Sequence, residues 1–251
     1  MPFALMVIGG LAQLAGTSAA IALGIAFFLA GFAHGAAEQQ SGTLRAFRPL
    51  DAAAYVVAGL AVAGLFLVLP LAGLTLFLLL SAWHFQHSAK GGPVVRWAFA
   101  LTAVGGSALW HPLDTGAVFA ALLGQGVPEA CMLALAAAGA AGFMMAMGAV
   151  IGRPQRYSLL ACVAATALFH PVLATGLAFF LGHAWPMQRE QAARFGWPKV
   201  LRAAAPTAIP AVLGALAIIA LAVSGHIALP LAAALAFGMA TPHILTARLE
   251  R

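Results

Sequence analysis

The sequence predicts an all-α, polytopic integral membrane bundle of about seven to nine transmembrane helices, on the strength of two observations. Hydrophobic residues make up 63% of the 251 residues and charged residues only 7%, whereas a soluble domain carries about 25% charged residues. The apolar runs also approach the roughly 20 residues that a helix needs to cross a bilayer. We therefore treat residues 1–251 as a single transmembrane domain.

Nine apolar segments are candidates for these helices, and turn residues or charges separate most of them: 15–37, 51–69, 71–88, 94–111, 128–151, 156–170, 171–187, 204–223 and 226–247. Residues 3–14 either extend the first helix or lie at the interface. Residues 113–126 form either an outer loop or a short interfacial helix. The stretch 156–187 is short for two crossings, but Pro171 favours a hairpin of two short helices. A single span there would invert the sides of all later segments.

The basic residues give these segments a direction. Arg or Lys follows the first, third, fifth, seventh and ninth segments, so all twelve lie on one side: Arg45, Arg48, Lys90, Arg96, Arg153, Arg156, Arg189, Arg194, Lys199, Arg202, Arg248 and Arg251. The opposite loops carry only Asp114 and Glu129. Positive loops face the cytoplasm, so we expect a multi-pass protein of the cell (inner) membrane with its N-terminus outside and its C-terminus cytoplasmic. The net charge of +6 forms no basic patch on a soluble domain, which argues against a nucleic-acid partner.

Eight histidines are the most informative feature of so apolar a chain, because ionisable groups inside membrane segments are costly and usually functional. The orientation places five of them near the inner ends of four helices: His34, His84, His87, His183 and His243. The others, His111, His170 and His226, fall on the outer side. Neutral imidazole is the commonest metal ligand, and helical bundles build metal sites from inward-pointing ligands. The alternative is that each is an interfacial or hydrogen-bonded side chain.

Spacing along two of these helices adds further candidates. His84 and His87 are three residues apart and share a helix face. Glu38 follows His34 by four residues and shares its face. A carboxylate there either binds a metal, orients a ligating imidazole, or is simply a charge at a cytoplasmic helix end.

Four segments resemble the motifs of a known family. Residues 31–38 resemble the motif PHGAxD, residues 81–85 resemble SxxHFG, residues 179–187 resemble FxxxHSxRH, and residues 241–245 resemble an LPHM-type segment. Their order and membrane setting are similar to those of the Brp/Blh family of membrane-embedded β-carotene dioxygenases. The resemblance spans about 210 residues.

This resemblance implies a non-haem Fe(II) cofactor and oxidative cleavage of the central double bond of β-carotene, or a related carotenoid, to retinal. The implied iron ligands are His34, His84 and His183. The family's fourth histidine is replaced here by Met187, a thioether that binds ferrous iron weakly. Candidates for a fourth ligand or a supporting role are His87, Met187, Glu38 and His243.

The implied partners are the lipid bilayer, a carotenoid and O2, with a functional link to a retinal-binding protein. Two other readings stay open. One is a non-catalytic relative that binds a carotenoid or retinal, since the fourth ligand has changed. The other is a small proton- or metal-coupled transporter that uses the inner histidines as a relay, although no repeated halves are evident in the sequence.

Overall fold

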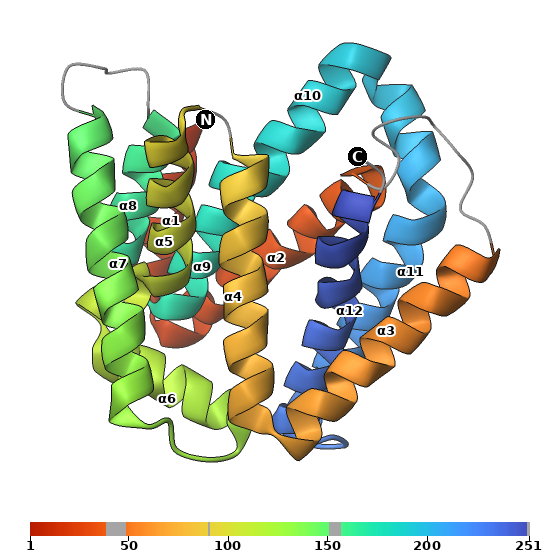
Figure 1. Ribbon diagram of the computed structural model, residues 1–251, viewed down its shortest axis with the longest axis horizontal. Helices are drawn as coiled ribbons and strands as arrows, with labels where there is room; N and C mark the ends of the chain where they lie inside the picture. The colour runs from red at the N-terminus through yellow and green to blue at the C-terminus, as the bar shows by residue number, and fades with distance from the viewer. Residues whose placement is uncertain (39–48, 90, 151–156, 250–251) are drawn as a thin grey trace. The chain divides into compact units, whose positions relative to one another are not determined.

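The computed structural model describes residues 1–38, 49–89, 91–150 and 157–249, with the side chains of all of these except 32–38, 49, 51, 52, 88, 150 and 243–249. Every secondary-structure element in these ranges is a helix. In chain order they are α1 (Pro2–Ala15), α2 (Thr17–Glu38), α3 (Pro49–Val68), α4 (Pro70–Ser88), α5 (Pro93–Trp110), α6 (Pro112–Leu123), α7 (Glu129–Val150), α8 (Tyr157–Leu168), α9 (Pro171–Phe179), the π-helix η1 (Phe180–Ala184), α10 (Trp185–Phe195), α11 (Trp197–Val223) and α12 (Leu229–Leu249) (Figure 1).

Proline marks where many of these helices begin. Six helices start on one: Pro2, Pro49, Pro70, Pro93, Pro112 and Pro171. Proline suits the first helical position because its fixed φ is already helical and the N–H it lacks would have no partner there. The predicted boundaries of the first five long segments therefore agree with α2, α3, α4, α5 and α7 to within a few residues.

The ambiguous stretches are resolved as helices. Residues 3–14 form a separate helix, α1, because Gly16 adopts a φ of 116° and interrupts the chain before α2. Residues 113–126 contain α6 and are therefore not a loop throughout. The stretch 156–187 divides before Pro171 into α8 and α9, which pack together as the predicted hairpin requires.

Among the residues that the structure describes, two helices are long and apolar enough to cross a membrane, α11 and the Glu129–Ala149 part of α7. Only 17% of the apolar window of α7, and 11% of that of α11, is buried within the structure. The core helix of a soluble protein would hide most of such a window, so these exposed apolar surfaces are suited to lipid. The predicted count of seven to nine crossings stays a prediction.

The chain divides into two compact units. The first comprises Met1–Gly31, Ser81–Ala120 and Gly126–Pro186, and the second comprises Phe32–Leu80, Ala121–Gln125 and Met187–Arg251. Several helices pass from one unit into the other.

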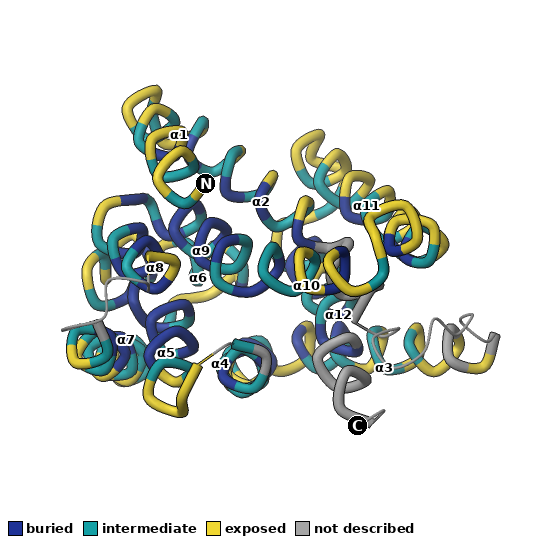
Figure 2. Tube along the Cα trace, turned by 90° about the horizontal axis from the view of Figure 1, so that it is seen from above, coloured by how far each residue is buried: buried dark blue, intermediate teal, exposed yellow. Residues whose placement is uncertain are grey.

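The first unit is built on very close helix packing. A Cβ added to Gly105 of α5 would lie 2.4 Å from the carbonyl oxygen of Leu135 on α7, and one added to Gly139 would lie 2.3 Å from the carbonyl oxygen of Gly105. Small residues allow such close approach of helices in membranes. Beside this pair, α8 and α9 contribute fully buried side chains, including Leu173 and Leu177, and Figure 2 shows the buried trace concentrated along α5, α8 and α9.

The second unit is organised by α3 and α12. Gly59 and Gly238 meet backbone to backbone, since a Cβ on either would lie within 2.7 Å of the other's carbonyl oxygen. The hydroxyl of Tyr55 donates to the carbonyl of Met239 at 2.6 Å. Phe237 contacts the ring of Phe66 at a centroid distance of 5.0 Å. The predicted segment 204–223 begins earlier, at Trp197, because the turn at Gly196 starts α11 there.

Candidate functional site

Two of the predicted inner histidines meet inside the first unit. The Nε2 atoms of His84, on α4, and His183, on η1, lie 3.0 Å apart. His84 is 5% exposed and His183 is 1% exposed, and their ring planes are inclined at 74°. Residues 99 positions apart in the chain thus present ring nitrogens to one point in the interior.

The local backbone explains how His183 is presented. It lies in η1, a single π-helical turn between α9 and α10; such turns are rare and occur frequently at functional sites. Gly182, the preceding residue, is packed so tightly that an added Cβ would lie 2.0 Å from Cε2 of Phe99. The wide turn and the ring of Phe99 together fix the position from which His183 projects.

Aromatic rings surround the histidine pair. Phe85 and Phe179 lie 5.1 Å and 5.8 Å from the His183 ring, centroid to centroid. Phe85 also contacts Phe99 at 5.6 Å. The surroundings of the pair are therefore apolar.

The distance between the two nitrogens fits two neighbouring ligands of one metal ion. Two nitrogens each about 2.1 Å from one ion, at about a right angle, would be about 3.0 Å apart. The same spacing allows one neutral ring to donate its N–H to the other. Among the described residues no group of three His, Cys, Asp or Glu side chains is close enough to hold a metal ion, so the pair supplies two donors and needs more.

The structure does not test three of the other predicted site residues. The side chains of His34, Glu38 and His243 lie outside the described residues. Met187 is half-buried on α10 and belongs to the second unit.

His87 makes contacts within its own helix. Its Nδ1 lies 2.8 Å from the carbonyl oxygen of Trp83, to which it donates. Its ring meets that of Trp83 edge-on at 5.3 Å, and the side-chain amide of Gln86 lies against it. His87 therefore contacts neighbouring residues of its own helix, and none of these contacts is with His84.

Two of the predicted outer histidines form hydrogen bonds with backbone groups. His111 ends α5, and its Nε2 donates to the carbonyl of Ala167 at 3.1 Å. His170 caps α9, where its Nδ1 accepts from the amide of Val172 at 3.4 Å. Burial lowers the pKa of His170 and His111 lowers it further, while Asp114 opposes the change. These groups neighbour one another, but their nitrogens satisfy main-chain groups.

Sequence reasoning missed Gln13 and the π-helix. Gln13 of α1 accepts a hydrogen bond from the amide of His170 at 2.9 Å. A lone glutamine in an apolar run was the available signal. No sequence pattern predicted the π-helix η1.

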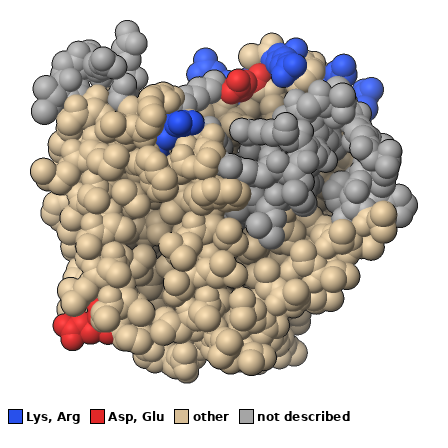
Figure 3. Space-filling model, in the orientation of Figure 1, with Lys and Arg blue, Asp and Glu red and all other residues tan. Residues whose placement is uncertain are grey.

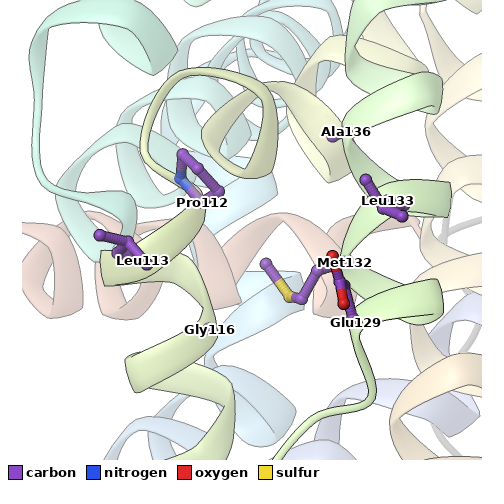
Figure 4. A pocket seen from close by; sticks show the side chains of 7 residues that line it. All are labelled: Pro112, Leu113, Gly116, Glu129, Met132, Leu133 and Ala136. Atoms are coloured by element: carbon purple, nitrogen blue, oxygen red, sulfur yellow. The ribbon is translucent and has the colours of Figure 1, made fainter.

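One open cavity of about 440 Å³ lies between α6 and α7. It is lined by Pro112, Leu113, Gly116, Glu129, Met132, Leu133 and Ala136 (Figure 4). No histidine contributes to its lining, so it is separate from the His84–His183 pair.

A family model described as beta-carotene 15,15'-dioxygenase matches residues 25–249. No curated protein and no solved structure matches the chain. The matched range includes all four motif-like segments identified in the sequence.

Proposed function

The chain belongs to the beta-carotene 15,15'-dioxygenase family, and on this premise we propose that it cleaves the central double bond of β-carotene or a related carotenoid to retinal, using Fe(II). The observation that carries the proposal is the 3.0 Å approach of the His84 and His183 Nε2 atoms in a buried, aromatic setting. Family membership supports carotenoid dioxygenase chemistry, and the pair supplies nitrogen donors suited to ferrous iron.

The proposed reaction balances without a further reductant. One O2 adds across the central C=C bond, that bond breaks, and each carbon leaves as an aldehyde, so one C40 carotene gives two C20 retinals. Bound ferrous iron would supply the site at which O2 becomes reactive toward the double bond.

The chain's own residues have three roles in this proposal. His84, His183 and His34 hold the metal as neutral imidazoles, with Met187, His87, Glu38 and His243 as candidates for a fourth ligand or support. Phe85 and Phe179 beside the pair exclude water. Their faces also suit contact with a polyene, which brings no polar group of its own. The close packing of Gly182 against Phe99 holds the backbone that carries His183 in place.

The setting that we propose is the cell membrane. The family and the exposed apolar surfaces of α7 and α11 indicate a membrane protein. The multi-pass topology, with the N-terminus outside and the C-terminus cytoplasmic, remains our proposal from the basic residues. Retinal released into the bilayer would be available to a retinal-binding protein.

The test is to purify the full chain in detergent, measure bound iron, and add β-carotene with O2. We expect about one iron per chain and retinal as the product, and the substitution His183→Ala should abolish both. His226→Ala, on a histidine that contacts Ser224 outside the pair, is the matched control and should change neither. Wild-type protein without metal would contradict the iron site. Iron without product would contradict the substrate or the reaction.

A second candidate function is favoured by Met187. The family motif has histidine at this position, and a chain lacking that ligand could bind a carotenoid or retinal without cleaving it. Under this alternative, purified protein would retain the pigment, visible in its absorption spectrum, and would yield no retinal even with excess Fe(II).

A further inference from the structure

Four exposed basic side chains gather where α10 meets α11 in the second unit. Arg189 and Arg194 lie on α10, and Lys199 and Arg202 lie on the first turns of α11. Glu190 is the only acidic residue between positions 130 and 249. Figure 3 shows basic side chains gathered at the edge that α10 and the start of α11 occupy in Figure 1. We name these four residues the basic elbow.

The turn between the two helices is held by Gly196. Its amide donates to the carbonyl of Ala192 at 2.8 Å, and its carbonyl accepts from Val200 at 3.2 Å. Its φ of 82° is in the left-handed region that favours glycine. The end of α10 and the start of α11 are therefore coupled through one residue, and their basic residues are fixed close together.

Phe195 brings basic residues of both helices to one ring. The guanidinium of Arg194 lies 5.0 Å and the ammonium of Lys199 lies 5.9 Å from its centroid. The ring itself packs on the buried face of α11, against Val200 and Ala204. Cation–π contacts of this kind restrain flexible side chains, so the elbow presents an organised cationic surface.

Exposed apolar side chains adjoin these cations. Trp197 is 41% exposed and Leu201 is 59% exposed at the start of α11, a helix long and apolar enough to cross a membrane. A tryptophan and several basic residues at such a helix end are typical of the interface between headgroups and hydrocarbon. A soluble phosphate ligand would gain nothing from Leu201, whereas a phospholipid presents both a phosphate and an acyl chain.

We propose that the basic elbow binds the headgroup of anionic phospholipid in preference to zwitterionic phospholipid. Basic clusters next to a membrane helix attract anionic lipids, and a guanidinium donates two parallel hydrogen bonds to a phosphate. Trp197 and Leu201 contact the acyl region below the headgroup. This inference is independent of the dioxygenase activity.

The test is native mass spectrometry of the purified full chain in detergent, titrated with phosphatidylglycerol or with phosphatidylcholine of the same acyl chains. We expect the first phosphatidylglycerol to bind about tenfold more tightly. The double substitution R194Q/K199Q should bring the ratio of the phosphatidylglycerol affinity to the phosphatidylcholine affinity close to one. R153Q/R156Q removes the same charge from two residues that are not part of the elbow, and it should leave the preference within about twofold. The conservative K199R should retain it. Equal melting temperatures would establish that the variants are folded.

Three outcomes would overturn the proposal. One is no preference for phosphatidylglycerol in the wild type. Another is an equal loss in R194Q/K199Q and R153Q/R156Q, which would mean that net charge alone attracts the lipid. The third is full competition by equimolar glycerol 3-phosphate, which would make the site one for free phosphate esters.

Discussion

Two pairs of histidines in the first unit differ in what their nitrogens meet. In the pair of His84 and His183, ring nitrogen faces ring nitrogen at 3.0 Å in the interior. In the pair of His111 and His170, the ring nitrogens serve backbone groups, the carbonyl of Ala167 and the amide of Val172. One pair therefore brings two ring nitrogens to a shared point, and the other completes helix ends.

This difference separates histidines that bind from histidines that cap. A metal ligand must place a lone pair at the ion and keep it unprotonated. A cap gains stability by satisfying a main-chain group that the helix leaves without a partner. Both uses place imidazole at least partly inside an apolar chain, so composition alone does not distinguish them. Substitution of each type should have distinct consequences.

The largest expected effect contrasts one histidine from each pair. His84→Ala should lower both bound iron and retinal formation by about two orders of magnitude or more, because losing even a supporting group of a metal site costs about 10–100-fold. His111→Ala should leave both within a few-fold but lower the melting temperature, since the carbonyl of Ala167 loses its donor. Iron analysis, product assay and thermal unfolding in detergent measure these. Equal loss of activity in the two variants would break the distinction.

The substitution Met187→His tests whether residue 187 contributes to the proposed iron site of His84 and His183. It restores the histidine of the family motif, and imidazole is a better ligand for ferrous iron than a thioether, so we expect about tenfold tighter iron binding. A chelator competition assay measures the affinity. Met187→Leu is the matched control, because it keeps the volume and removes the sulfur. If both variants bind iron as the wild type does, residue 187 takes no part in the site.

A smaller effect is expected where η1 packs on α5. Gly182→Ala places a methyl 2.0 Å from Phe99, and such overpacking costs about 1–3 kcal/mol. Unfolding midpoints should fall, and a second substitution, Phe99→Leu, should restore part of the loss. Gly148→Ala is the control, since nothing lies within 4 Å of its added Cβ and it should be stabilised by about 0.5–1 kcal/mol. An undiminished midpoint for Gly182→Ala would mean that the ring of Phe99 moves freely and does not hold His183.

The helix boundaries could be predicted from the sequence, because they follow from one-dimensional signals. Hydrophobic runs of limited length and prolines at helix starts set the boundaries. The positions of the basic residues assigned His84 and His183 to the same side, and the structure brings them together.

Other features depend on contacts between distant segments and had no such signal. Gln13 reaches His170 across 157 positions, and the fit of Phe99 over Gly182 joins α5 to η1. The same limit applies to His87, where spacing predicted a neighbour of His84 but the ring turns to the backbone of Trp83. A shared helix face restricts where a side chain can lie, and its partners are decided by packing.

The smallest expected effect tests the capping pair by pH. His170 lies in the turn between α8 and α9, outside α7 and α11, the two described helices that are long and apolar enough to cross a membrane, and burial lowers its pKa from 6.5. His111 lowers the pKa further and Asp114 opposes both, while Gln13 binds the His170 amide. The unfolded chain then binds more protons than the native one below about pH 6.5, so this contribution to stability is present above that pH and is lost as pH falls toward the native pKa.

The substitution His170→Asn isolates this contribution, because asparagine is a good N-cap and does not titrate. The wild-type melting temperature should fall more steeply than that of His170→Asn between pH 7 and pH 5.5. The reason is that protonation removes the Nδ1 lone pair that accepts from Val172. Parallel curves would mean that the imbalance of protonation is too small to matter and that His170 acts only through its shape. Divergent curves with unchanged iron content at pH 7 would assign the titration to the capping pair and leave the binding pair untouched.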